Sequence, residues 1–295
     1  MLQAPPLNPA RSYEEAMQRV QAFQACDDDR ILPQARTALF DHGRKTEHVV
    51  VLLHGFTNHP GQYREFAPLV FARGANVFVP RMPEQGDRDR MTRRMADLTA
   101  ESLLARASEA VDIACGLGER VRVAGISSSG LLCAYFAAHR TDIDRAVPIS
   151  PVFAILKLPY WLSALTAQIM LLLPDMFLWW DPRLREAQHP ATAYPQFPTH
   201  ALAQTLRIGD DVYADSKREP LWARSIAFAT NKNDPAVNNR VTEEVCARWK
   251  CRRPDAVSLF EFINLPANHD IIDPDNPRAR TDIVYPKLLE LIGPP

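Results

Sequence analysis

The stretch "VRVAGISSSGLLCAYFAAH", residues 121–139, joins two contrasting apolar patterns through three consecutive serines. The segment 121–126 is short, apolar and rich in β-branched residues, which predicts a buried strand. The segment 130–139 has small and large apolar residues at helical spacing, which predicts a helix. The serines therefore lie at a strand-to-helix junction, where they can form a turn, cap the helix or present a nucleophile.

The small residues around the serines single out one of them. A nucleophile at such a junction has a small residue two positions before it and another two positions after it, because the sharp turn brings the strand and helix backbones together. Ser127 fits this pattern, with Gly125 before it and Ser129 after it. Centring the pattern on Ser128 or Ser129 instead puts an isoleucine or a leucine at a tight position. Ser127 is therefore the candidate nucleophile, although glycine is more usual where this chain has Ser129.

Apolar runs and amphipathic stretches alternate along the rest of the chain. Strand–helix alternation at this density predicts an α/β fold, with a mostly parallel sheet covered by helices on both faces. The strands are expected at 48–55, 76–80, 121–126, 144–150, 225–231 and 257–264, and the helices at 61–74, 95–118, 130–139, 237–250 and 283–293.

A segment rich in proline, tryptophan, leucine and methionine interrupts this alternation at 151–224. It predicts three parts of the chain: an N-terminal part of the core at 1–150, a helical cap at 151–224 and a C-terminal part of the core at 225–295. Gln168, Pro174 and Asp175 break the apolar run, so a membrane-spanning helix is not expected. The cap either packs on the sheet or forms a lid whose inner face lines a substrate pocket. The aromatic residues expected to line such a pocket are Trp161, Phe177, Trp179 and Trp180.

Composition narrows the class of partner. The chain has 295 residues and a formal net charge of −1, which gives no electrostatic case for binding nucleic acid. Its five cysteines form no pattern with metal-ligand spacing, and a Cys246–Cys251 disulfide is left open. The first residues lack the layout of a signal peptide, which favours the cytoplasm, while export stays open if a leader has been removed.

Two further residues complete a catalytic pattern with Ser127. A serine nucleophile needs a base, and the base needs a carboxylate that orients it. Asp234 follows one predicted strand and His269 follows the last one, which is the order expected in this architecture. The alternative carboxylates, Asp270 and Asp273, lie on the same loop as His269 rather than on the preceding one.

The loop "HGFTNHPGQY", at the end of the first predicted strand, is expected to supply part of an oxyanion hole. An oxyanion hole in this arrangement takes one N–H from the residue after the nucleophile, here Ser128, and one from such a loop. The N–H of Phe56 is the expected second donor. His54 is interpreted as a structural residue that organises the loop.

The chain resembles the α/β-hydrolase superfamily, and in particular bacterial carboxylesterases and monoglyceride-lipase-like serine hydrolases. The segments that carry the resemblance are "LLHGFTNHPGQY", "NVFVPRMPEQG", "VAGISSSG", "TNKNDPAVN" and "NHDII". The resemblance implies an α/β-hydrolase fold with a cap at the insertion and no metal or organic cofactor. It also implies Ser127 as nucleophile, Asp234 as orienting acid and His269 as base, with Phe56 and Ser128 as oxyanion donors.

The expected activity is hydrolysis of a small, hydrophobic carboxylic ester through an acyl-enzyme. Hydrolysis of peptides or amides, cleavage of a carbon–carbon bond, and a non-catalytic binding role on the same fold remain alternatives. Weak contact of the cap with lipid is also left open, and the sequence does not determine the oligomeric state.

Overall fold

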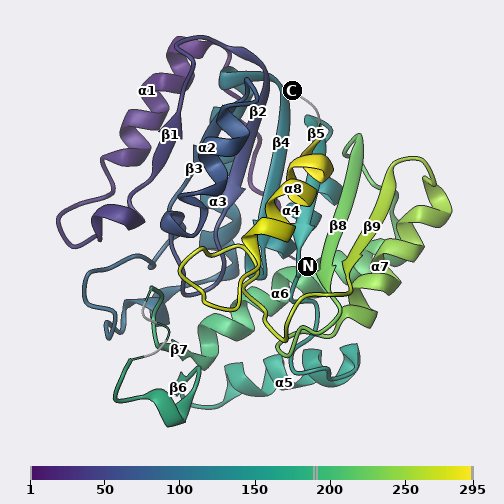
Figure 1. The fold of residues 1–295 in the computed structure, drawn as a ribbon. Helices are drawn as coiled ribbons and strands as arrows, with labels where there is room; N and C mark the ends of the chain where they lie inside the picture. The colour runs from purple at the N-terminus through teal and green to yellow at the C-terminus, as the bar shows by residue number, and fades with distance from the viewer. Residues whose placement is uncertain (1, 189, 191, 294–295) are drawn as a thin grey trace.

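The apolar runs of the sequence form a seven-stranded sheet within the computed structural model, which describes residues 2–188, 190 and 192–293. The strand order is β1-β3-β2-β4-β5-β8-β9, and every neighbouring pair is parallel except β1 with β3 (Figure 1). The strands of this sheet are β1 Ala38–Phe40, β2 Thr46–Leu53, β3 Asn76–Val79, β4 Gly118–Ile126, β5 Ile143–Ile149, β8 Ser225–Asn231 and β9 Val257–Phe262. The α/β-hydrolase architecture predicted from the sequence is confirmed.

Helices cover both faces of the sheet, and the central strands supply apolar side chains to both. In β2, Val49, Val51 and Leu53 belong to the core shared with α1, α3, α4, α6 and α7, whereas Val50 and Leu52 belong to the core shared with α2 and α8. This is why the run is continuously apolar rather than alternating. The helices are α1 Tyr13–Gln24, α2 Phe66–Phe71, α3 Ala100–Leu117, α4 Ser128–His139, α5 Tyr160–Leu172, α6 Thr199–Arg218, α7 Asn239–Arg252 and α8 Thr281–Ile292.

The described part of the segment 151–224 contains α5, α6 and a small hairpin formed by β6 Phe177–Trp179 and β7 Gln196–Pro198. Helix α6 packs against α4 and also contacts α3 and α7, so it belongs to the helical layer on one face of the sheet. Helix α5 and the hairpin lie beyond that layer, at the lower end of the molecule in Figure 1. The division of the chain at 151 and 224 stays a prediction.

The helix expected at 237–250 begins at Asn239, and the helices expected at 61–74 and 95–118 begin later still, each of these two for a local reason. In the segment 61–74, a 3₁₀ turn at Pro60–Tyr63 comes first, because His59 Nδ1 accepts from the Gly61 N–H. In the segment 95–118, α3 begins after Thr99, whose side chain forms a reciprocal capping box with Ser102. Helix α1, strand β1 and the hairpin were not predicted.

The structure also bears on the cysteines and on the apolar run of the segment 151–224. Cys246 and Cys251 both lie in α7 as free thiols. Among the described residues, no helix is both long enough and apolar enough to span a bilayer.

Candidate active site

Ser127 occupies a strained turn between β4 and α4. Its backbone lies at φ 60° and ψ −116°, in a region that residues other than glycine avoid at a cost of about 1–3 kcal/mol. The Ser127 N–H donates to the Ile149 carbonyl of β5 at 2.8 Å, which ties the turn to the neighbouring strand. The turn projects the serine side chain at the carboxyl edge of the sheet, as a nucleophile elbow does.

The elbow requires small residues where the two backbones meet. A Cβ on Gly125 would lie 2.7 Å from the Ser129 carbonyl oxygen, closer than any real contact. Ser129 fits this space and is 1% exposed. Its hydroxyl also donates a hydrogen bond to the His54 carbonyl, which connects the elbow to the loop after β2. Only the small size of Ser129 was predicted from the sequence, and this contact was not.

The three predicted catalytic residues are brought together in a line. His269 Nε2 lies 2.8 Å from Ser127 Oγ, and His269 Nδ1 lies 2.7 Å from Asp234 Oδ2. Asp234 is 1% exposed, and its other oxygen accepts from the backbone N–H groups of Ala236 and Val237 at 2.8 and 3.3 Å. The carboxylate is therefore fixed on both oxygens, and it fixes the imidazole in turn.

The surroundings of His269 favour its protonated form. Burial alone would lower the pKa of His269, whereas the Asp234 carboxylate raises it through its charge and its hydrogen bond. The charge of Asp270 acts in the same direction, and the net effect raises the pKa above its ordinary value. An imidazole with this environment is suited to accept a proton from Ser127.

The alternative carboxylates have other partners. Asp270 accepts from Gln62 Nε2 at 2.8 Å and from Asn58 Nδ2 at 3.2 Å, both on the loop after β2. Asp273 accepts from Asn58 at 3.4 Å and from Thr192 Oγ1 at 3.3 Å. These two carboxylates are therefore bound to the neighbouring loop rather than to the imidazole. Neither Gln62 nor Asn58 was predicted from the sequence to be a site residue.

His54 organises the loop after β2, as interpreted from the sequence. Burial lowers the pKa of His54 to about 3, so the ring is neutral. Its Nε2 accepts from the Met82 N–H at 2.9 Å, which places the proton on Nδ1, 3.0 Å from the Gly55 carbonyl oxygen. The Asn58 N–H also donates to that carbonyl, at 3.2 Å.

These contacts orient the peptide group that joins Gly55 to Phe56. The C=O and N–H of a trans peptide point in opposite directions. With the Gly55 carbonyl directed at His54 and Asn58, the Phe56 N–H is directed away from them. Ser128 is the first residue of α4, so its N–H has no partner within the helix. Both predicted donors thus belong to backbone whose direction is fixed by its neighbours.

The four aromatic residues predicted to line a substrate pocket differ in how they relate to the site. Trp180 meets Phe56 edge-to-face, with ring centroids 6.2 Å apart, and its Nε1 donates to Thr57 Oγ1 at 3.1 Å. Phe177, in strand β6 of the hairpin, stacks under the guanidinium of Arg93. Trp179, two residues further along β6, is half-buried. Trp161, in the first turn of α5, is 65% exposed. Of the four, Trp180 has the direct contact with a predicted site residue.

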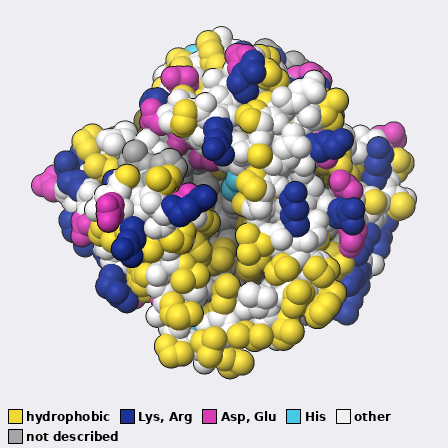
Figure 2. All heavy atoms as spheres, turned by 60° about the horizontal axis from the view of Figure 1, so that its bottom comes forward, with side chains coloured by type: hydrophobic (Ala, Val, Ile, Leu, Met, Phe, Trp, Pro, Cys, Tyr) yellow, Lys and Arg dark blue, Asp and Glu magenta, His cyan; other side chains and the backbone are white. Residues whose placement is uncertain are grey.

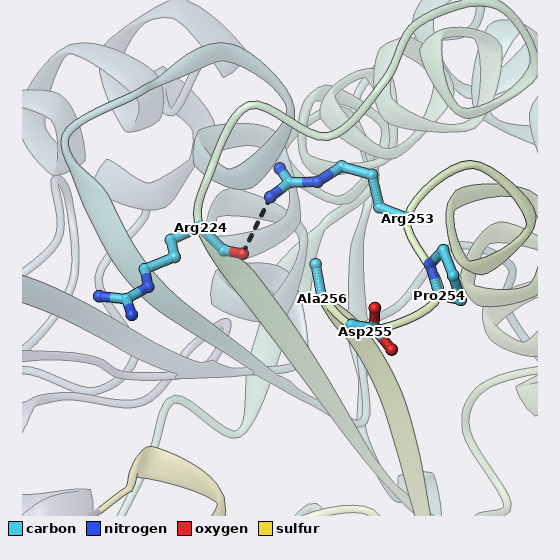
Figure 3. Close-up of a pocket in the computed structure, with 5 residues that line it drawn as sticks. All are labelled: Arg224, Arg253, Pro254, Asp255 and Ala256. Carbon is cyan, nitrogen blue, oxygen red and sulfur yellow. Dashed lines mark hydrogen bonds between the residues drawn. The ribbon is translucent and has the colours of Figure 1, made fainter.

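Away from Ser127 and His269, the described residues form a surface cleft but no metal site. Among the described residues, no group of three His, Cys, Asp or Glu side chains is arranged to hold a metal ion. A cleft of about 300 Å³ lies on the surface before β8 and β9, at the opposite sheet edge from Asp234 and His269. Figure 3 shows the Arg253 guanidinium in this cleft bonded to the Arg224 carbonyl, which is a structural contact.

Comparison with known proteins agrees with this fold. Residues 50–281 match the alpha/beta hydrolase family. The chain belongs to that family. A search of curated proteins found no match to the chain.

Several solved structures of lipolytic enzymes share the fold of this alpha/beta hydrolase. A metagenome-derived lipolytic enzyme is 18% identical, with a TM-score of 0.64 over 89% of this chain and 98% of its own. The monoacylglycerol lipase of Paleococcus ferrophilus is 18% identical, with a TM-score of 0.64 over 87% and 97%. A soluble variant of the Saccharomyces cerevisiae monoglyceride lipase, in complex with a substrate analogue, is 13% identical, with a TM-score of 0.60 over 87% and 90%. Identities this low establish the fold alone.

The close approach at the elbow yields a stability prediction. Gly125→Ala should destabilise the hydrolase by about 1–3 kcal/mol, because its new methyl group meets backbone that cannot move without disturbing the turn. Ser129→Ala keeps the small size and loses only the hydrogen bond to His54, so it should cost about 1 kcal/mol. Urea denaturation of both variants measures the difference. Equal stability of Gly125→Ala and the wild type would contradict the close approach.

Proposed function

We propose that this alpha/beta hydrolase is a serine hydrolase that cleaves carboxylic esters through an acyl-enzyme intermediate. The observation that carries the proposal is the His269 ring, hydrogen-bonded to Ser127 Oγ on one side and to Asp234 on the other. This is the arrangement in which a histidine takes the proton of a serine while a carboxylate stabilises the resulting imidazolium.

The reaction begins with attack by Ser127 Oγ on the ester carbonyl carbon, while His269 Nε2 takes the hydroxyl proton. The carbonyl oxygen becomes an oxyanion, which accepts hydrogen bonds from the N–H groups of Phe56 and Ser128. The tetrahedral intermediate then collapses, the bond to the alcohol oxygen breaks, and His269 delivers its proton to that oxygen. Water, deprotonated by His269, attacks the acyl-enzyme, and the acid leaves as Ser127 regains its proton.

The substrate we favour is a hydrophobic ester, because Trp180, which contacts Phe56, belongs to an exposed apolar surface. Among the described residues, sixteen large apolar side chains are exposed, and ten of these lie between positions 156 and 184. We call these ten residues the apolar face. They are Leu156, Trp161, Leu165, Ile169, Leu172, Leu173, Met176, Leu178, Trp180 and Leu184. Figure 2 shows apolar side chains gathered around a hollow on the end of the molecule that bears α5 and the hairpin.

The apolar face also supports contact with a lipid surface, which is where a hydrophobic ester dissolves. Helix α5 has no charged residue, and its buried side chains are the small residues Ser163 and Ala167. Four large apolar side chains of α5 are exposed: Trp161, Leu165, Ile169 and Leu172. The exposed Lys157 and Arg185 lie nearby in the chain. Exposed apolar side chains flanked by basic residues form a surface that can contact a lipid interface. Trp180 belongs both to this face and to the surroundings of Phe56, so it connects the lipid contact to the site.

Removing the catalytic groups should abolish ester turnover. Ser127→Ala and His269→Ala should each lower kcat for p-nitrophenyl butyrate by about 10⁴-fold or more, and the double variant should lose little beyond that. Asp234→Asn should cost less than His269→Ala. A panel of p-nitrophenyl esters of rising chain length, run beside peptide and amide substrates, measures both the rates and the bond preference. Full activity in Ser127→Ala would refute the proposal.

The pH dependence follows from the raised pKa of His269. Only the neutral imidazole accepts a proton, so kcat/KM should fall as the pH falls through that pKa. Because the pKa is raised, the midpoint of this acidic limb should lie above about 6.5, the ordinary value for histidine. A rate profile between pH 5 and 9 gives the midpoint, and a midpoint clearly below 6.5 would contradict the assignment of His269 as the base.

The lipid contact can be separated from catalysis. Leu165→Glu combined with Ile169→Glu should weaken co-sedimentation with phosphatidylcholine vesicles by about tenfold or more, because two apolar side chains can no longer enter the lipid. Turnover of water-soluble p-nitrophenyl acetate should be unchanged. Leu69→Glu is the matched control, since Leu69 is 42% exposed but lies on α2. Unchanged co-sedimentation of the double variant would exclude α5 as the contact.

A further inference from the structure

One buried side chain amide joins the two loops on which the proposed mechanism depends. Gln62 lies in the 3₁₀ turn Pro60–Tyr63 and is 2% exposed. Its Oε1 accepts from the Gly55 N–H at 2.8 Å, and its Nε2 donates to Asp270 Oδ2 at 2.8 Å. Gly55 immediately precedes Phe56, and Asp270 immediately follows His269. A single amide thus links the loop of an oxyanion donor to the loop of the base.

The chemistry of the partners allows only one orientation of this amide. The Gly55 N–H can only donate, so it requires the amide oxygen. The Asp270 carboxylate accepts, so it requires the amide nitrogen. Rotating the amide by 180° would place donor against donor and acceptor against acceptor. The side chain is therefore a directional connection between the loops rather than a space-filling residue.

Asp270 is held firmly at the other end of this connection. Its Oδ2 also accepts from Asn58 Nδ2 at 3.2 Å, and its Oδ1 accepts from the Asp273 N–H at 3.2 Å. The ionisable groups that act on it are Asp273 and His269, and its charge in turn reaches the hydroxyls of Tyr63 and Tyr285. Burial and the charge of Asp273 raise the pKa of Asp270 to about 6, against the Gln62 hydrogen bond and the charge of His269, which lower it.

We propose that Gln62 and Asp270 are positioning residues that hold the Phe56 N–H and the His269 ring in one geometry during ester hydrolysis. This inference rests on the proposed function. The developing oxyanion must meet the Phe56 N–H while Ser127 transfers its proton to His269, so the two loops must keep a fixed separation. A displacement of about 1 Å between such groups costs on the order of 10²-fold in rate. The Gly55–Gln62–Asp270 connection opposes that displacement.

The first test removes both hydrogen bonds of Gln62 and keeps its length. Gln62→Met should lower kcat for p-nitrophenyl butyrate by about 10- to 100-fold and change KM by less than about twofold, because the loss falls on the transition state. Rates are expressed per active site titrated with a fluorophosphonate, so that unfolded protein does not contribute. The matched control is Thr192→Val, which removes a hydrogen bond to Asp273 on the outer side of the same carboxylate pair. It should leave kcat unchanged.

The second test reverses the connection. Gln62→Glu alone places two carboxylates together and should lower kcat at least as much as Gln62→Met. Combining Gln62→Glu with Asp270→Asn restores one donor and one acceptor in the opposite order, and Asn58 can still donate to Asp273. The double variant should recover most of the lost kcat, which a volume effect would not produce.

A third measurement reports on His269 directly. The charge of Asp270 contributes to the raised pKa of His269, so Asp270→Asn should move the acidic limb of kcat/KM to lower pH. Thr192→Val should leave the limb in place. A residue with a purely structural role would change the melting temperature without moving this midpoint.

The outcomes separate this inference from the proposed function. If wild-type protein shows no Ser127-dependent ester turnover, the proposed function fails. If the wild type is active and Gln62→Met has the same kcat per titrated site, the positioning role is overturned. An equal fall of kcat in Gln62→Met and Thr192→Val would overturn it as well, because the effect would then belong to the carboxylate pair in general.

Discussion

The strained backbone of Ser127 is the constraint to which the rest of the site is fitted. Its positive φ persists because the surrounding elements determine it from several sides. The Ser127 N–H is bonded to β5, and its carbonyl accepts from Leu131 within α4 and from Val152 beyond β5 at 3.3 and 3.4 Å. The close approach of Gly125 and Ser129 completes this support. Since β4, β5 and α4 all meet at this turn, the packing energy of the central sheet stabilises one unfavourable residue.

Two carboxylates, Asp234 and Asp270, raise the pKa of His269, but they form hydrogen bonds with different partners. Asp234 is bonded to the imidazole and to backbone N–H groups, so it orients the ring. Asp270 is one residue from the imidazole in the chain but is bonded to side chain amides of the loop after β2. Both charges raise the pKa of His269. In our proposal, the same chemical group thus serves as orienting acid in one place and as a link between loops in the other.

The sequence was sufficient where the deciding signal was local. Ser127, Asp234 and His269 each follow an apolar strand, and parallel strands bring their carboxyl ends to one edge, so the alignment of the three side chains could be anticipated. The contact between Gln62 and Asp270 could not, because it joins residues 208 positions apart with no local pattern to mark it. The helix expected at 61–74 was wrong at its start for a related reason, since the cap that His59 provides there is a side chain detail.

Helix α5 leaves more large apolar side chains exposed than is usual for a surface helix. Its small side chains pack toward the molecule, and Tyr160 stacks on Tyr213 of α6 with ring centroids 3.5 Å apart. Met170 and Leu171 also pack partly against the core, but Trp161, Leu165, Ile169 and Leu172 remain exposed, although burying each would contribute about 1.5–3 kcal/mol. Hydropathy alone predicted an apolar cap and could not assign which side faced outward. In our proposal, the exposed side chains of α5 and Trp180, which contacts Phe56, together receive a hydrophobic ester from an apolar phase.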